Sequence, residues 1–229
     1  MERISAPVKS RRVYDSTRRR EQALRNREAL LEAARHLFLS GGYAATTLAA
    51  IASAAGLSVE TVHKAYGGKR GLVRAIWERG LEGTGPIPAP TRSDRMQERE
   101  AEPRRIVEQW GRLTAEVAPR AAPVLLLIRT AAATDPDMYA LLREADAERL
   151  ARMELNAGRL AACGGLRPGV TLEQARDVLW TFSSPDLYDL LVGRRGWPLE
   201  RYGRFVAEAM IAALLPLADR ERGGRRARP

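Results

Sequence analysis

The sequence predicts an all-α fold, and two features of its patterning support this. Apolar residues recur at the three- and four-residue spacing of helix faces along most of the chain, and no segment alternates as a strand does. Glycine pairs and prolines interrupt these patterns where helices would end and begin. With 45% hydrophobic residues in 229, the chain can bury a sizeable core of packed helices.

Composition excludes several classes of protein. No apolar run reaches the roughly 18 residues of a membrane span. Cys163 is the single cysteine, and His36 and His63 are the two histidines, so a disulfide framework is excluded and neither a metal site nor a cofactor is expected. The basic start of the chain is not followed by an apolar segment, which predicts a protein without a secretory signal and with a cytoplasmic location.

Positive charge is concentrated in the N-terminal third of the chain. The formal net charge is +10, and residues 1–82 contain 15 Lys and Arg against 8 Asp and Glu. This asymmetry favours a polyanionic partner for that part of the chain. A general contribution to solubility would account for the same composition.

The patterning divides the chain into five segments. We expect a flexible basic arm at 1–20, a compact helical domain at 21–82, a linker or loop rich in Pro, Gly and charge at 83–103, a second helical domain at 104–218, and a basic tail at 219–229.

Four helices are expected within residues 21–82. Three of them end at glycines, which are Gly41-Gly42, Gly56 and Gly67-Gly68. Thr46 and Ser58 are the expected N-caps of the second and third helices. The apolar positions that mark the four helices are Leu24, Ala29, Leu31, Ala34, Leu37 and Phe38; Leu48, Ile51, Ala52 and Ala55; Val59, Val62 and Tyr66; and Leu72, Val73, Ile76, Trp77 and Leu81.

The second and third of these helices have the features of a helix-turn-helix. Such a motif needs a small residue where the helices cross and a glycine in the tight turn, and Ala52 and Gly56 meet both needs. Ser58 at the next cap leaves a helix N-terminus facing outward, which suits phosphate. An ordinary helical hairpin would show the same small residues, but the basic charge of this third of the chain favours DNA binding.

The run from Leu31 to Trp77 also resembles the DNA-binding domain of the TetR family of regulators. The matching residues are AARHLFLSGGYAATTLAAIASAAGLS and ETVHKAYGGKRGLVRAIW. The resemblance implies a three-helix DNA-binding domain whose fourth helix connects to a helical domain for ligand binding and dimerisation. It implies phosphate contacts from Thr47, Thr61 and Lys69, and base or backbone contacts from Ser58, Val59, Glu60, His63 and Lys64.

Two features near this motif have alternative interpretations. His63 stands where a tyrosine is usual in the family, and it either donates to DNA or packs against the turn. Arginines of the arm either enter the minor groove or form a solvated tail, and they are Arg11, Arg12, Arg18, Arg19 and Arg20.

The C-terminal half reads as further helices at about 104–117, 121–133, 136–162, 171–192 and 198–217. The last two are amphipathic and resemble the final helices of TetR-type proteins, including the Leu-Leu-Val-x-x-x-Gly-Trp stretch that ends at Trp197. The resemblance implies that they form a four-helix bundle with a second copy of the chain. The alternative is that both helices complete the core of one monomer.

Aromatic and methionine residues of this half are candidates to line an apolar pocket for a small molecule, with polar anchors such as Arg129, Asp135 or Asp186. These candidates are Trp110, Met138, Tyr139, Met153, Trp180, Phe182 and Tyr188. Plain core packing is the alternative for each of them.

The sequence therefore predicts a dimeric transcriptional repressor that a small-molecule ligand releases from its operator. A ligand-independent protein that organises DNA is the second hypothesis. An enzyme is not expected, because the sequence has no nucleophile elbow, phosphate loop or dinucleotide fingerprint.

Overall fold

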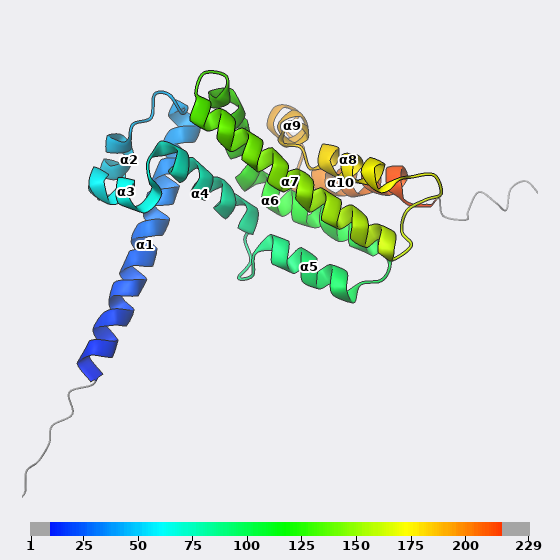
Figure 1. Cartoon of the computed structure of the whole chain (residues 1–229), viewed down its shortest axis with the longest axis horizontal. Coiled ribbons are helices and arrows are strands. Elements are labelled where there is room, and N and C mark those ends of the chain that lie inside the picture. Colours follow the sequence, from blue (N-terminus) through cyan, green and yellow to red (C-terminus); the bar gives the residue numbers. More distant parts are fainter. Residues whose placement is uncertain (1–9, 217–229) are drawn as a thin grey trace, which may run out of the picture. The chain divides into compact units, whose positions relative to one another are not determined.

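The computed structural model describes residues 10–216, and every regular element within them is a helix (Figure 1). The all-α prediction is therefore confirmed. Residues 1–9 and the predicted basic tail at 219–229 lie outside the described residues, as do the side chains of Arg11, Arg12 and Arg19. The chain divides into two compact units, Met1–Ile76 and Trp77–Pro229.

The first unit contains α1 (Ser10–Gly41), α2 (Leu48–Ala54), α3 (Val59–Tyr66) and the first half of α4 (Lys69–Glu82). Its core is made by residues that are at most 5% exposed, which are Leu30, Leu31, Ala34, Phe38, Ile51, Ala52, Val62, Leu72, Val73 and Ile76. The expected arm is wrong for residues 10–20, because α1 already begins at Ser10. Leu24 was expected on the buried face but is 60% exposed, since α1 extends beyond the helices that cover its C-terminal half.

The N-cap of α2 differs from the prediction by one residue. The hydroxyl oxygen of Thr47 accepts a hydrogen bond from the amide of Ala50 at 3.1 Å, so Thr47 is the cap. The buried hydroxyl of Thr46 lies 2.7 Å from the carbonyl of Gly42 and 3.1 Å from that of Leu37, and it donates to them. Thr46 therefore satisfies carbonyls at the end of α1 rather than amides at the start of α2.

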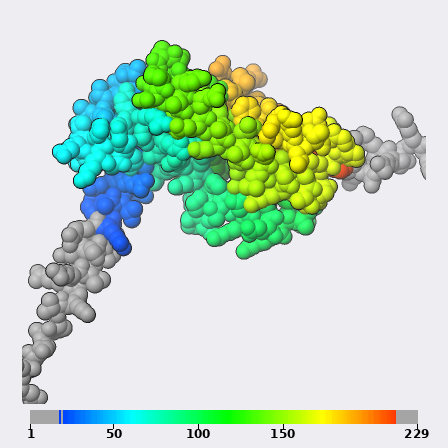
Figure 2. Space-filling model, viewed as in Figure 1, coloured from blue at the N-terminus to red at the C-terminus, as the bar shows by residue number. Residues whose placement is uncertain are grey.

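The second unit contains the rest of α4, α5 (Ala89–Arg99), α6 (Pro103–Ala132), α7 (Pro136–Ala162), α8 (Leu172–Phe182), α9 (Pro185–Tyr188), the π-helix η1 (Asp189–Arg194) and α10 (Leu199–Leu214). Helix α6 packs against α5, α7, α9 and α10, and α8 packs against α7 and α10 (Figure 1). In the space-filling view, α7 and α8 cover much of the near face of this unit, in yellow-green and yellow (Figure 2). No helix within residues 10–216 is long and apolar enough to cross a membrane.

Three expectations for the second unit are wrong. The supposed linker at 83–103 contains α5, whose buried Ala89 and Ser93 fix it to the unit. The helices expected at 104–117 and 121–133 are one helix, α6, which continues through Pro119 and Pro123 because it packs against helices on several sides. The helix expected at 171–192 ends at Phe182, since Pro185 starts a new turn.

Helices α6 and α10 approach each other closely at a pair of glycines. A Cβ atom added at Gly203 would lie 2.7 Å from the carbonyl oxygen of Gly111, and one added at Gly111 would lie 2.4 Å from that of Gly203. Contacts this short with backbone atoms cannot be relieved by a side-chain rotation. Glycine is therefore required at both positions for the two backbones to meet.

We expect Gly203→Ala to lower the free energy of unfolding by about 1–3 kcal/mol, because the two helices must move apart to admit the methyl group. Thermal unfolding followed by circular dichroism measures the effect. Gly158→Ala on α7 is the matched control, since a Cβ there meets nothing within 4 Å and alanine favours the helix by up to about 1 kcal/mol. Equal stability of the two variants would contradict the close approach of α6 and α10.

Candidate nucleic-acid interface and ligand cavity

The turn between α2 and α3 has the geometry of a helix-turn-helix. Gly56 adopts a φ of 66°, which is the left-handed region that favours glycine. The amide of Leu57 donates to the carbonyl of Ala52 at 2.9 Å and closes the turn. Ile51, Ala52 and Val62 are at most 1% exposed, so the inner faces of both helices are buried as the sequence predicts.

The outer face of α3 carries polar side chains into solvent. Ser58 caps the helix by accepting from the amide of Thr61 at 3.1 Å, and the hydroxyls of the two residues lie 2.8 Å apart. Glu60, His63 and Lys64 are exposed. Val59, an apolar position of the predicted helix and a predicted DNA contact, is 43% exposed and lies at the start of this outer surface.

Lys69, at the start of α4, is held against the loop that follows α1. Its ammonium donates to the carbonyl of Tyr43 at 2.5 Å and lies 4.1 Å from the centre of the Tyr43 ring, which stacks on Phe38. A Cβ at Gly71 would lie within 1.8 Å of the carbonyl oxygen of Tyr66, so the start of α4 touches the end of α3. The position of Lys69 relative to α3 is thereby fixed within the first unit.

The second unit contains a partly open cavity of about 390 Å³. It is lined by residues from α4, α5, α6, α7, α8, α10 and the turn before α9, and most of its wall is apolar. The lining residues include Trp77, Leu81, Ala89, Trp110, Leu113, Val117, Ala118, Ala121, Leu125, Met153, Leu179 and Met210, together with the polar Ser93, Thr114, Glu148, Arg149, Arg152, Asn156, Ser183 and Ser184. This volume lies in the range typical of small-molecule sites.

One wall of the cavity is a face of α7. Arg149, Arg152, Met153 and Asn156 have the i, i+3, i+4, i+7 spacing that places side chains on one side of a helix. Arg152 pairs with Asp94 of α5 at 2.9 Å, and Arg159 pairs with the same carboxylate. Burial alone would raise the pKa of Asp94, but hydrogen bonds from the two arginines lower it below its usual range.

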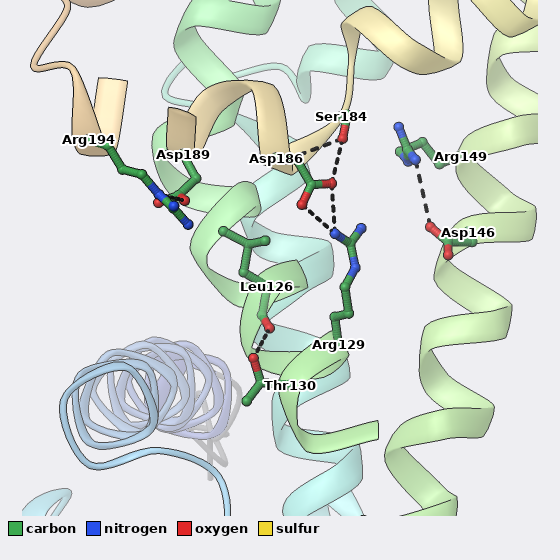
Figure 3. A network of polar contacts seen from close by, with 9 residues as sticks. All are labelled: Leu126, Arg129, Thr130, Asp146, Arg149, Ser184, Asp186, Asp189 and Arg194. Atoms are coloured by element: carbon green, nitrogen blue, oxygen red, sulfur yellow. Dashed lines mark hydrogen bonds and ion pairs between the residues drawn. The ribbon is translucent and has the colours of Figure 1, made fainter. Parts of the chain in front are cut away.

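Arg149 is the most enclosed of these cations, with 13% of its side chain exposed. Its Nη1 donates to the carbonyl of Trp180 at 2.8 Å and to the hydroxyl of Ser183 at 3.2 Å, and its guanidinium lies 4.3 Å from the Trp180 ring centre. Burial lowers the pKa of the Arg149 guanidinium below its ordinary value. In Figure 3 this side chain points from α7 toward Ser184.

Two other ion pairs fix elements at the edge of the cavity. Arg92 of α5 forms a bidentate pair with Glu116 of α6, which also accepts hydrogen bonds from Thr84. Arg129 of α6 donates to both carboxylate oxygens of Asp186 in α9, at 2.6 and 2.7 Å (Figure 3). These pairs join α5 and α9 to the same central helix.

Comparison with known proteins identifies the first of these two sites. Residues 30–76 match the family model described as bacterial regulatory proteins, tetR family. The chain carries the DNA-binding domain of the TetR family. It is a DNA-binding transcriptional regulator of that family, and the matched residues contain α2, α3 and most of the buried core of the first unit.

Solved structures show that the whole fold is shared with such regulators. The complex of SmeT with triclosan aligns with a TM-score of 0.65 at 24% identity, covering 83% of this chain and 92% of that chain. NalD of Pseudomonas aeruginosa, the secondary repressor of the MexAB-OprM multidrug efflux pump, aligns with a TM-score of 0.63 at 21% identity, covering 85% and 98%. A structure from Saccharomonospora viridis in complex with choline aligns at 0.61 and 18%, covering 83% and 98%. A comparison with curated protein sequences finds no match.

The structure brings the predicted DNA-contacting residues of this TetR-family domain into one unit. Ser58, Val59, Glu60, Thr61, His63 and Lys64 lie on or beside the exposed face of α3, while Thr47 and Lys69 lie at the starts of α2 and α4. Which of them touch DNA stays a prediction. The sequence interpretation missed Tyr43, which follows the Gly41-Gly42 helix end and positions Lys69.

Most of the predicted pocket residues lie outside the lining of this cavity. Of the seven aromatic and methionine candidates, Trp110 and Met153 line the cavity. Met138 is fully buried, and Tyr139 is 54% exposed. Both lie in the first turn of α7, about three turns before Arg149, and neither reaches the cavity. Tyr188 packs edge-on against Tyr202, Trp180 stacks on Arg149, and Phe182 packs against the core.

The expected polar anchors are also elsewhere. Asp135 caps α7, and Arg129 and Asp186 pair with each other. Arg149, Arg152 and Asn156 supply the polar wall instead. Their helical spacing was visible in the sequence, but only the packing shows that this face of α7 borders a cavity.

The Arg92–Glu116 pair predicts a pH-dependent contribution to stability. Hydrogen bonds from Arg92 lower the pKa of Glu116 to about 2 from its usual 4.5, against the opposing effect of burial. A depressed pKa means that the stabilisation is present above about pH 4.5 and is lost as the pH falls toward 2. We expect Glu116→Gln to lower the free energy of unfolding at pH 7 by about 1.5–3 kcal/mol, and the difference from the native chain to shrink between pH 4.5 and 2.

Denaturant unfolding at several pH values measures this difference. Glu98→Gln on α5 is the matched control, because Glu98 is exposed and makes no hydrogen bond or ion pair within residues 10–216. A Glu116→Gln deficit that stays constant down to pH 3 would show that the Glu116 carboxylate is not the source of the stabilisation.

Proposed function

We propose that the protein is a homodimeric repressor that binds a palindromic operator through α3 and leaves it when a small molecule enters the cavity of the second unit. The observation that carries the DNA-binding part is the exposed polar face of α3 above a buried Val62 in a helix-turn-helix. The exposed groups suit base edges in the major groove, because a carboxylate such as Glu60 accepts from cytosine and a cation such as Lys64 donates to guanine or phosphate.

The proposed dimer uses α8 and α10. The outward side of α10 and the segment before it expose large apolar side chains, with Leu190 at 50%, Leu199 at 40% and Phe205 at 36%. Trp197 packs edge-on against Phe205, with ring centres 5.6 Å apart, and Arg201 lies over the Trp197 ring. Such an apolar surface on a soluble helix is typical of an isologous dimer interface. A two-fold dimer would also present two copies of α3 to the two half-sites of a palindrome.

The ligand-responsive part rests on the cavity. It has the volume and largely apolar lining of a small-molecule site. Trp77 and Leu81 of α4 line it, and α4 is the helix that begins with Lys69 in the DNA-binding unit. A ligand that changes the position of α4 would change the spacing of the two recognition helices, which must match one turn of DNA. The triclosan complex of the similar SmeT structure supports this part.

A ligand-independent protein that organises DNA is the second candidate function. It requires no cavity in the second unit, so the observed cavity favours the ligand-responsive repressor.

A gel-shift titration with the DNA that flanks the chain's own coding region tests the proposed function. A discrete complex that survives excess unrelated DNA supports an operator-binding dimer, and footprinting should then show two half-sites about one helical turn apart. Binding to all sequences with equal affinity would favour the DNA-organising alternative.

We expect Lys64→Ala to weaken binding to every DNA sequence and to reduce the slope of log affinity against log salt by about one per protomer. Lys64 is preferable to Lys69 for this test, because Lys69 also holds Tyr43 in the fold. Fluorescence anisotropy with labelled DNA at several salt concentrations measures the slope. Arg104→Ala, an exposed cation of the second unit, is the control. An unchanged slope for Lys64→Ala would place Lys64 away from phosphate.

We expect Phe205→Glu to convert the dimer to a monomer, because each interface would bury two carboxylates in an apolar surface. Light scattering after size exclusion measures the mass of the particle. Leu155→Glu on α7 is the control, since Leu155 is similarly exposed, at 45%, and lies on a different helix. A Phe205→Glu protein that stays dimeric would place the interface elsewhere.

A further inference from the structure

We propose that the cavity of the second unit takes an organic acid, with one carboxylate bound by Arg149 and an apolar body against α6. This inference rests on the proposed function only in treating the cavity as a ligand site. It names the class of ligand from the charges and the lining of the cavity.

Arg149 has hydrogen-bonding capacity that the fold leaves unused. A guanidinium carries five N–H groups, and the Nη1 donors reach the Trp180 carbonyl and the Ser183 hydroxyl. The Nε atom is buried and has no hydrogen-bond partner. Two neutral oxygens therefore orient the guanidinium without neutralising it.

The charge of Arg149 is also incompletely balanced. Its ion pair with Asp146 spans 3.7 Å, which is too long for a hydrogen bond (Figure 3). A cation that is 87% buried, stacked on Trp180 and without a carboxylate at hydrogen-bond distance is costly to desolvate. An anionic ligand would offset that cost, and a carboxylate matches the planar fork of the guanidinium.

The other charged groups of the cavity favour a single carboxylate at this position. Arg152 is already engaged within the fold, because it pairs with Asp94 at 2.9 Å, a carboxylate that it shares with Arg159. Glu148 is an exposed carboxylate in the lining, so it disfavours a second negative charge on the ligand. A cationic ligand would meet Arg149, whose guanidinium already occupies the face of Trp180 that could otherwise bind an ammonium group.

The wall formed by α6 defines the rest of the ligand. Helix α6 supplies apolar side chains of different size, with small residues at Ala118, Ala121 and Ala122 and larger ones at Trp110 and Leu125. Met153 and Met210 add flexible apolar surface that can adapt to different shapes. This wall offers no charged partner along its length, so the body of the ligand is expected to be hydrocarbon or aromatic.

Calorimetry on the full chain tests the ligand class with matched probes. Decanoate, decanamide and decylamine share a chain and differ in charge, and 1-naphthylacetate with its amide repeats the comparison on an aromatic body. We expect at least one acid to bind about tenfold or more tightly than its amide, as a charge-assisted pair with Arg149 would give. Equal affinity of acids and amides, a preference for the amine, or no binding by any probe would overturn the proposal.

Variants of α7 connect the preference to the residue. Arg149→Met keeps the apolar stem and removes the charge, so the ratio of acid to amide affinity should fall to about one. Arg143→Met, an exposed arginine on the same helix, should leave the ratio unchanged. Because Arg149 also contacts Trp180 and Ser183, Arg149→Lys serves if Arg149→Met does not fold; it should keep part of the preference. Two results would contradict the role of Arg149 as a carboxylate-binding cation. One is a full acid preference in Arg149→Met. The other is the absence of any acid preference in a folded Arg149→Lys.

The same titrations separate this proposal from the proposed function. If an acid binds with the Arg149-dependent preference but does not release the operator in a gel shift, the ligand class is correct and the release mechanism is wrong. If operator release follows the amides rather than the acids, the release mechanism stands and the ligand class is wrong.

Discussion

The contact between α6 and α10 at Gly111 and Gly203 is the constraint on which the second unit depends. The backbones of the two helices meet there, because neither glycine leaves room for a Cβ atom. Val107 of α6 joins Val206 of α10 in a packed core, and Trp110 and Met210 border both that core and the cavity. Ala118, Ala121 and Ala122 of the same helix also line the cavity. One helix therefore forms both the densest contact of the unit and a wall of its open space.

Ion pairs hold the neighbouring helices around that space. Arg92 and Glu116 connect α5 to α6, Asp94 connects α5 to α7 through two arginines, and Arg129 and Asp186 connect α6 to α9. Arg149 differs from these cations, because the fold gives it neutral acceptors and a distant carboxylate. A polar group that the fold positions without satisfying is typical of a binding site, where a ligand completes the contacts.

The first unit could be predicted closely from the sequence, and the second could not. Ala52 lies at the helix crossing, Gly56 in the turn and Ser58 at the cap. Because each of these roles is local, the residue types indicate the motif directly. The one-residue error at Thr46 arose because both threonines can cap, and only the packing shows that Thr46 reaches back to α1. Helix α6 was predicted as two helices because Pro119 and Pro123 normally interrupt a helix, and tertiary contacts override that preference. Large aromatic residues such as Trp180 were expected to line a pocket, but Trp180 packs against Arg149. Arg149 and Asn156 line the cavity although neither was among the predicted pocket residues.

Thermodynamic linkage between the two sites is the most direct measure of how this TetR-family regulator works. A ligand that weakens operator binding must itself bind less tightly to the operator-bound protein, by the same factor. The affinity of the chain for decanoate can be measured by calorimetry without DNA and with saturating operator. We expect weaker binding in the presence of operator, with a ratio equal to the loss of operator affinity that decanoate causes. Equal affinities in the two conditions would show that the cavity and α3 are not coupled.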